Sequence, residues 1–307
     1  MQYFRDTLDV SINEPTAITL GKFDGVHRGH TYLIAHLRKL QKEKNLKSVI
    51  FTFVKPPKDE IEQAKHEVLS TIEEKERIFN ELHIDYVIEY PFSKEVMNME
   101  AVDFIEFLVR KLNVKAIVVG DDFHFGKGRQ GNTLLLEELK EEYGYELIVV
   151  KKKQYAGEDI SSTLIREKVK EGEIEIANDL LGYEYFMEGV VGSGNRIGTK
   201  IGVPTINLIL PPQKLLPPIG VYASKIYIDD ERYYGITNVG NKPTIGDFPV
   251  GVETNIFDYQ GDLYGKTVRV TVGKYIRGEK KFGSTEELRD QIMKDVKILQ
   301  SYYKKLT

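Results

Sequence analysis

The 307-residue sequence contains no cysteine and no tryptophan. Without cysteine, the chain cannot form disulfides, use a thiol nucleophile or bind a metal through thiolates. It also lacks an apolar run of about 18 residues, which argues against a membrane-spanning helix. The N-terminal stretch MQYFRDTLDVSINEP has no apolar core of the kind that secretory signals need. We therefore expect a soluble, cytoplasmic protein.

Neither sign of charge dominates the chain. It has 43 lysines and arginines against 47 aspartates and glutamates, giving a formal net charge of −4. This balance argues against a protein built to bind nucleic acid. Hydrophobic residues make up 41% of the chain and charged residues 29%, as in ordinary proteins with a packed core. The length predicts two domains.

The first half alternates short β-branched runs with amphipathic stretches. Strands are expected at 17–20, 48–54, 86–89, 116–120 and 147–151. Helices are expected at 30–43, 72–82, 101–112 and 133–143. Continuous apolar runs such as Ala116–Val119 suit strands that are buried on both faces, and strands alternating with helices form parallel sheets. The sequence therefore predicts an α/β fold with a doubly wound parallel sheet.

The pattern changes after Gly182. Residues 185–274 show alternation of period two, interrupted by Gly, Pro and Asp turns, which predicts a small antiparallel barrel or sandwich. Ser284 followed by Glu286 and Glu287 is typical of a helix start, so a terminal helix is expected to about Tyr303. The expected domains are residues 1–183 and 184–307.

Two histidines stand where the first strand turns into the first helix. His27 and His30 are three residues apart, so on a helix they would share one face. Gly29 between them would let a phosphate approach the backbone. The helix N-terminus supplies free N–H groups and a dipole that favours anions. Together these features could stabilise charge on a phosphoryl group during transfer.

Two other interpretations of the histidines remain open on residues alone. An isolated H-x-x-H is more often a pair of surface histidines in a polar turn. The spacing could also suggest zinc, but zinc needs further ligands and no cysteine is available.

Further segments carry groups suited to phosphates. Ser161, Ser162 and Thr163 offer hydroxyls at an expected helix start, and Arg166 adds a guanidinium one turn later. A plain helix cap is the alternative interpretation. In the second half, Thr205 and Asn207 alternate on one side of a strand, so their oxygens can converge on one Mg²⁺ and its phosphates. The Gly-rich run 192–198 precedes no helix, so the context of a dinucleotide-binding fold is missing.

The motifs resemble one enzyme family over almost the whole chain. Residues 21–30 read G-x-F-D-G-x-H-x-G-H, which resembles the nucleotidyltransferase signature in the adenylyltransferase half of bacterial riboflavin kinase/FAD synthetases. Residues 160–166 are similar to I-S-S-T-x-I-R of the same family, and residues 120–126 to G-x-D-F-x-F-G. Residues 198–207 resemble the riboflavin kinase pattern G-R-x-L-G-F-P-T-A-N, and residues 275–282 the segment F-L-R-x-E-x-K-F.

The resemblance implies FAD biosynthesis in two steps. Riboflavin would be phosphorylated to FMN with ATP, and AMP would then pass from ATP to FMN, giving FAD and pyrophosphate with Mg²⁺ as the metal. It implies catalytic roles for His27, His30 and Glu253, the last as the base for the ribityl hydroxyl. The ATP- and phosphate-binding residues implied are Gly21, Phe23, Asp24, Gly25, Gly29, Ser161, Ser162, Thr163, Arg166, Gly192, Gly198 and Thr205. Flavin would be bound by Asp122, Phe123, Phe125 and Arg277, and the metal by Thr205 and Asn207.

The chain departs from the family patterns at several positions. Lys55-Pro56-Pro57 stands where F-x-P-H-P has its histidine, and His124 where an arginine is common. In the second half, Thr199 replaces an arginine, Val203 a phenylalanine and Asn255 a frequent histidine. A lost arginine beside a phosphate would weaken binding by about 1.5–3 kcal/mol.

These departures leave two alternatives beside the two-step enzyme. The chain could be an FMN adenylyltransferase only, with a kinase-like domain that has lost its activity. It could also be a non-catalytic flavin or nucleotide sensor, which the presence of His27, His30 and Arg166 disfavours.

Overall fold

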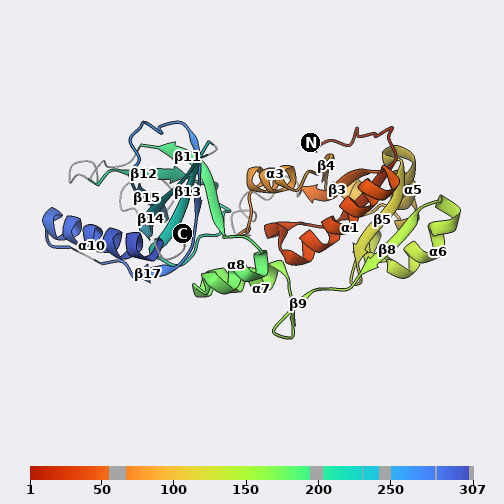
Figure 1. The fold of residues 1–307 in the computed structure, drawn as a ribbon. Helices are drawn as coiled ribbons and strands as arrows, with labels where there is room; N and C mark the ends of the chain where they lie inside the picture. Colours follow the sequence, from red (N-terminus) through yellow and green to blue (C-terminus); the bar gives the residue numbers. More distant parts are fainter. Residues whose placement is uncertain (55–66, 194–202, 230, 242–249, 281, 304–307) are drawn as a thin grey trace. The chain divides into compact units, whose positions relative to one another are not determined.

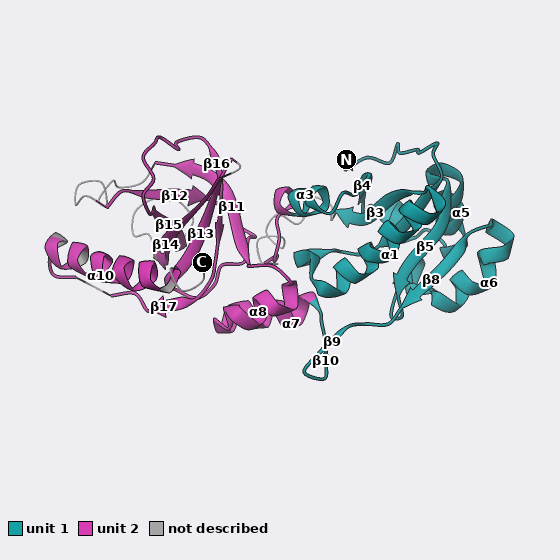
Figure 2. Cartoon of the chain, viewed as in Figure 1, with its two compact units in different colours: residues 1–63, 75–161 teal, residues 64–74, 162–307 magenta. Residues whose placement is uncertain are grey.

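The computed structural model describes residues 1–54, 67–193, 203–229, 231–241, 250–280 and 282–303. The chain divides into two compact units (Figure 2). The first comprises Met1–Gln63 and Lys75–Ser161, and the second Ala64–Glu74 and Ser162–Thr307. A short segment from the first half of the sequence thus belongs to the second unit. The boundary near residue 183 concerns independent folding and stays a prediction.

A six-stranded, fully parallel sheet forms the centre of the first unit, in the order β1-β4-β3-β2-β5-β8. Figure 1 labels β3, β4, β5 and β8 of this sheet. Its strands are Gln2–Arg5 (β1), Thr16–Leu20 (β2), Lys47–Val54 (β3), Tyr86–Pro91 (β4), Val114–Gly120 (β5) and Glu146–Val150 (β8). From β2 the chain proceeds outward through β3 to β4, then crosses to the other side through β5 to β8. The predicted doubly wound parallel sheet is confirmed. The edge strand β1 escaped prediction because it is short and carries no apolar run.

Helices cover both faces of this sheet because its strands alternate apolar side chains between the faces. Ala17 of β2 packs with Leu37 and Leu40 of α1 (Arg28–Lys44), whereas its neighbour Ile18 packs with Phe104 and Ile105 of α5 (Ala101–Leu112). The helices of this part of the chain are Arg28–Lys44 (α1), Ile72–Glu81 (α3), Lys94–Met97 (α4), Ala101–Leu112 (α5) and Thr133–Tyr143 (α6). Helix α3 begins within the segment assigned to the second unit.

The second unit contains an antiparallel barrel. Strands β14-β15-β12-β11-β16-β13 pair in this order, and a further pairing of β13 with β14 closes the ring. The strands are Phe186–Gly192 (β11), Thr205–Ile209 (β12), Gly220–Ile228 (β13), Glu231–Asn241 (β14), Val250–Ile256 (β15), Thr267–Thr271 (β16) and Tyr275–Arg277 (β17), the last pairing with β13 outside the ring. This confirms the expected barrel.

Among the described residues, three helices lie wholly within this unit. They are Ser162–Glu171 (α7), Ile174–Leu181 (α8) and Thr285–Tyr303 (α10). The Ser284 side chain accepts a hydrogen bond from the backbone N–H of Glu287 at 3.2 Å, which is the predicted helix cap. At the other end, the Tyr303 hydroxyl donates to the carbonyl of Ser224 at 2.9 Å, so α10 is fixed to the barrel at its last residue.

Short elements complete the described chain. They are the 3₁₀ turns Asp24–Val26 (η1) and Lys127–Arg129 (η3), the paired strands His124–Phe125 (β6) with Gly131–Asn132 (β7), and Gln154–Tyr155 (β9) with Glu158–Asp159 (β10). Among the described residues, no helix has both the length and the apolar character needed to cross a membrane.

Candidate active sites

The N-terminal motif lies where the strand order of the parallel sheet reverses. Strands β2 and β5 are neighbours in the sheet, yet the chain leaves them toward opposite sides. Ligands of open α/β sheets bind beside the carboxyl ends of such strands. The loop after β2 carries His27, and the loop after β5 carries Asp122. The topology therefore brings the first and third predicted motifs to one end of the sheet.

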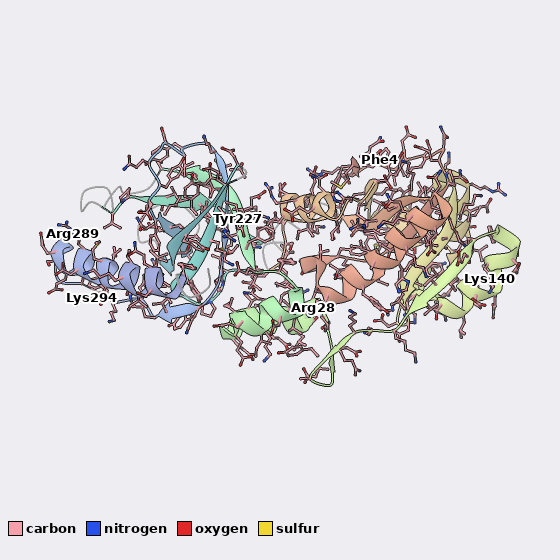
Figure 3. All side chains as sticks on the ribbon, in the orientation of Figure 1. Phe4, Arg28, Lys140, Tyr227, Arg289 and Lys294 are labelled. Atoms are coloured by element: carbon pink, nitrogen blue, oxygen red, sulfur yellow. The ribbon has the colours of Figure 1, made fainter. Side chains whose placement is uncertain are left out.

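His27 and His30 stack on one another at the start of α1, next to Arg28, which Figure 3 labels. Their ring centroids are 3.7 Å apart and the rings are 22° from parallel. The helix begins at Arg28, earlier than predicted, and His27 precedes it with an extended backbone. The argument from helical spacing, by which the two histidines would share one helix face, therefore does not hold, because His27 lies outside the helix. Their rings nevertheless meet because the His27 side chain folds over the first turn.

Gly29 makes room for this stack. A Cβ at position 29 would lie 3.1 Å from both Cε1 and Nδ1 of His27, and 3.8 Å from the carbonyl oxygen of Ile160. A contact of 3.1 Å is tighter than most real Cβ contacts, so the ring of His27 would have to shift. Ile160, the residue just before Ser161, therefore lies beside the histidine pair.

The turn between β2 and α1 holds bulky residues in left-handed backbone conformations. Phe23 has φ 50° and Val26 has φ 35°, and both side chains are fully buried. Such residues adopt positive φ only where the surroundings impose it, at a cost on the order of 1–3 kcal/mol each. Because the Phe23 ring is buried, any contact of this residue with ATP would use its backbone. The strained turn fixes the position of the histidines.

Burial keeps both histidines uncharged. It lowers the pKa of His27 to about 4, and burial together with His27 lowers the pKa of His30 well below its ordinary value. The Nδ1 atoms of the two rings are buried and have no hydrogen-bond partner among the described residues. At neutral pH the pair is thus two neutral imidazoles, which can donate or accept hydrogen bonds without first losing a proton.

The serine-rich segment opens a helix, as predicted. Helix α7 begins at Ser162, one residue after Ser161, and Arg166 lies one turn into it. The division between the two units falls between Ser161 and Ser162. The first residues of the segment therefore belong to the unit with the histidines, and Ser162, Thr163 and Arg166 to the other.

A cavity of about 760 Å³ lies at the carboxyl ends of β5 and β8. It is lined by Asp121, Asp122, Lys151, Lys152, Gln154 and Asp159. Lys152 Nζ lies 2.8 Å from the Asp122 carboxylate and 3.6 Å from that of Asp159. The Asp122 hydrogen bond is the main reason why the pKa of Lys152 is raised. The sequence analysis did not anticipate this pairing.

The other two flavin candidates of this loop differ in exposure. Phe123 is half-buried, whereas Phe125 is buried and packs on Phe104 of α5 with ring centroids 5.8 Å apart. The two rings stack on one another at 5.5 Å. Of the two rings, Phe123 is therefore the one whose exposed surface a ligand can contact.

Polar residues of three adjacent barrel strands share one face. In the register, Asn207 of β12 lies opposite Glu253 of β15, and Glu253 in turn lies opposite Asn238 of β14. Thr205 lies opposite Asn255 in the same register, two residues from the first pair and therefore on the same face. The structure thus brings the predicted metal ligands and the predicted base together. Asn207 is 7% exposed and Asn255 is 8% exposed, so part of this face is covered.

Other residues fix or border this face. The Asn255 side chain donates to the carbonyl of Pro204 at 2.7 Å, which ties β15 to the residue before Thr205. A cavity of about 160 Å³ beside Thr205 is lined in part by Val191, Tyr259 and Tyr264. Gly192 lies opposite Asn207 in the register, and a Cβ there would meet the side chain of Ile209 at 2.6 Å.

Arg277 is held by α10. Its Nε and Nη2 atoms donate to Oδ2 of Asp295 at 2.9 and 2.7 Å, and Gln291 donates to the other carboxylate oxygen at 2.8 Å. Asp295 is 1% exposed. The guanidinium therefore has a fixed orientation, set by a residue that the sequence analysis did not single out.

Several predicted features lie outside the described residues. These are Gly198, Thr199 and Lys55-Pro56-Pro57. Val203 is described and is 5% exposed, so it lies in the packed part of the barrel.

Two family models match the chain in the order of its two halves. A model described as FAD synthetase matches residues 9–164, and one described as riboflavin kinase matches residues 181–303. The second match favours the two-step enzyme over an adenylyltransferase with an inactive kinase-like domain.

Relatives of similar length match almost the whole chain. The bifunctional riboflavin kinase/FMN adenylyltransferase of Buchnera aphidicola (subspecies Schizaphis graminum) is 36% identical over 95% of both chains. The Escherichia coli K12 enzyme of the same name is 34% identical over 94% of this chain and 93% of its own.

A solved structure is similar over the full length. It is described as a macrolide-efflux protein from Streptococcus pneumoniae, with a TM-score of 0.84, 30% identity, and coverage of 97% of this chain and 98% of that chain. The sequence relatives and the family models agree on FAD biosynthesis through both activities. The chain therefore belongs to the family of bifunctional riboflavin kinases/FMN adenylyltransferases.

Proposed function

We propose that the two reactions of this enzyme occur at two separate sites, FMN adenylylation at the His27–His30 stack and riboflavin phosphorylation at the polar face of β12 and β15. The observation that carries the first assignment is the pair of stacked, neutral imidazoles at the N-terminus of α1. The substrates are riboflavin, FMN and ATP.

In the first site, a phosphate oxygen of FMN attacks the α-phosphorus of ATP and pyrophosphate leaves. Charge grows on the oxygens of the transferred group. The imidazole N–H groups of His27 and His30 donate to them, and the α1 N-terminus adds its dipole. Because the rings are neutral and already positioned, they need neither lose a proton nor reorient. The turn residues Gly21, Asp24, Gly25 and Gly29 lie around the phosphates.

The leaving pyrophosphate and the flavin have proposed ligands of their own. Ser161, Ser162, Thr163 and Arg166 hold pyrophosphate through hydroxyl, N–H and guanidinium donors. The location of Ile160 beside Gly29 supports this assignment. Asp122 and Phe123 contact the flavin at the carboxyl end of β5, with Phe125 supporting Phe123 from the core.

In the second site, the ribityl 5′-hydroxyl attacks the γ-phosphorus of ATP and ADP leaves. Glu253 takes up the hydroxyl proton, and Arg277 contacts the flavin from the edge of the barrel. Thr205 and Asn207 supply a hydroxyl and an amide oxygen, and such oxygen donors fit Mg²⁺, which takes few protein ligands and several phosphate oxygens. When bound, Mg²⁺ would neutralise charge on the transferring phosphates.

The proposed domain boundary lies near residue 183. It is supported by the family matches, which end at residue 164 and resume at residue 181. A protein of residues 1–183 is expected to make FAD from FMN, and aggregation of every version cut between residues 178 and 190 would contradict this. A cytoplasmic location and the lack of nucleic-acid binding stay predictions from composition.

The assignment of sites is tested by crossing two sets of variants with two assays. His27→Ala and His30→Ala should each lower FAD formation from FMN on the order of 10²-fold, the effect of removing one preorganised donor. Formation of FMN from riboflavin should stay unchanged in both. Glu253→Gln should instead lower formation of FMN from riboflavin and leave FAD formation unchanged. The loss should appear mainly in kcat, because glutamine cannot accept the proton. Near-normal FAD formation by a folded double variant of both histidines would overturn the first assignment.

A further inference from the structure

Two phenylalanine rings, those of Phe23 and Phe79, continue the stack of histidines into the core of the first unit. The ring of His30 contacts that of His27 and also that of Phe23, with the centroids of His30 and Phe23 4.8 Å apart and their planes at 44°. Phe23 in turn receives the ring of Phe79 edge-on, with centroids 5.9 Å apart and planes at 83°. The rings of His27, His30, Phe23 and Phe79 thus form an unbroken series of contacts, which we call the aromatic column.

Phe79 differs from the other members of the aromatic column in its origin. His27, Phe23 and His30 all come from the strained turn and the first turn of α1, within eight residues of sequence. Phe79 comes from α3, almost fifty residues later, and its side chain is fully buried. Through this ring, a separate element of the fold contacts Phe23.

Phe23 lies in contact with both Phe79 and His30. Gly21 leaves room for the Phe23 ring, because a Cβ there would lie 3.2 Å from it. Phe23 also sits at φ 50°, a conformation that an aromatic residue keeps only where packing enforces it. An edge-to-face contact is directional and is worth about 0.5–1.5 kcal/mol beyond the area that it buries. Removal of the Phe79 ring would let Phe23 relax, and His30 would lose its fixed neighbour.

We propose that Phe79 is a positioning residue for FMN adenylylation, acting through Phe23 on the ring of His30. This proposal rests on the proposed catalytic role of His30. Phe79 contacts neither substrate and has no part in proton transfer. Its contribution is to keep the His30 imidazole in the orientation in which its N–H reaches the transferring phosphoryl group, which matters because small misplacements of catalytic groups cost large factors in rate.

The test measures FAD formation by Phe79→Leu in the full-length protein. We expect kcat to fall roughly tenfold, with the KM values for FMN and ATP within about twofold of wild type, because orientation and not binding is lost. Formation of FMN from riboflavin in the same sample should be unchanged. The matched control is Ile84→Val, which removes buried aliphatic packing just after α3 without touching a ring. It should leave kcat within about twofold.

A double-mutant cycle separates positioning from general loss of structure. If Phe79 acts through His30, Phe79→Leu should change the residual rate of His30→Ala by less than about twofold. The proposal would be overturned if the double variant lost the product of the two single-variant factors in kcat. It would also be overturned if Ile84→Val lowered kcat as much as Phe79→Leu does. An unchanged kcat in Phe79→Leu would overturn it as well. If Phe79→Leu does not fold, Phe79→Met, which keeps the volume without the ring, is judged by the same criteria. Near-normal activity of His30→Ala would instead overturn the proposed function.

Discussion

Glu74 and Lys214 form a buried ion pair in the second unit, although 140 residues separate them in the sequence. Lys214 Nζ lies 2.7 Å from Glu74 Oε2, and the two side chains are 1% and 0% exposed. Lys214 also donates to the carbonyl of Leu69, and Glu74 accepts from the backbone N–H of Glu188 on β11. These bonds fasten residues 67–74 to the barrel unit.

The pair is also part of a helix cap. Glu74 accepts from the backbone N–H of Thr71 at 3.0 Å, while the Thr71 hydroxyl accepts from the N–H of Glu74 at 3.2 Å. This reciprocal arrangement opens α3. Burial raises the pKa of Glu74, whereas Lys214 and the N–H donors lower it. One carboxylate thus starts a helix and neutralises a buried lysine.

Lys214→Met is expected to have different effects in two contexts. In the full chain it removes the charge that compensates Glu74, so the free energy of unfolding should fall by about 3–5 kcal/mol. In a protein of residues 162–307, Glu74 is missing and Lys214 regains contact with water. There the same substitution should change stability by less than about 0.5 kcal/mol. Denaturant unfolding of the full chain and of residues 162–307, each with and without Lys214→Met, measures both effects.

The control is the double variant Glu74→Leu with Lys214→Met in the full chain. It removes both charges together, so it should be more stable than either single variant. Equal losses from Lys214→Met in the full chain and in residues 162–307 would show that the methionine harms the barrel itself and not the pairing with Glu74.

Stability should depend on the protonation of His27. Its pKa is near 4 in the folded protein and near 6.5 in the unfolded chain, so the unfolded state binds more protons between these values. The free energy of unfolding therefore falls as pH drops through this window. Wild type should lose about 3 kcal/mol more than His27→Ala between pH 7 and pH 4. Parallel losses in the two proteins, measured by urea unfolding, would contradict the lowered pKa.

Gly29→Ala should separate folding from FAD formation. The backbone at Gly29 is not left-handed, and alanine favours helix over glycine by about 0.5–1 kcal/mol, so the fold should be retained. The new Cβ would push the His27 ring from its place, and FAD formation should fall roughly tenfold. Steady-state kinetics with FMN measure the loss, and riboflavin phosphorylation in the same sample is the control. Unchanged FAD formation would show that the stack tolerates movement.

Asp295→Asn should weaken the attachment of α10. The variant leaves the guanidinium of Arg277 without its counter-charge in a site where Asp295 is 1% exposed. We expect a loss of about 1.5–3 kcal/mol in thermal or denaturant unfolding. Because the orientation of Arg277 is released, the KM for riboflavin should also rise. Asp290→Asn, an exposed position on the same helix, is the control. Similar effects of both variants would argue against a role for the ion pair.

The sequence by itself determined the main features of this protein. Alternation of apolar runs with amphipathic stretches predicts the parallel sheet, and period-two alternation predicts the barrel, because both patterns express which side chains local geometry can bury. The motif at residues 21–30 identified the family because its spacing is local. Thr205 and Asn207 were predicted from a local strand pattern and Glu253 from the family resemblance, and the strand register places all three on one face.

Only the tertiary structure decided which distant residues support these motifs. Nothing near Phe79 in the sequence distinguishes it from an ordinary core residue, and its contact with Phe23 exists because α3 packs against the turn after β2. Asp295 and Lys214 likewise find their partners through the packing of separate elements. The stack of His27 on His30 also needed coordinates, since His27 precedes the helix. Local periodicity records which face of an element is buried, but the partner on that face depends on how the elements pack.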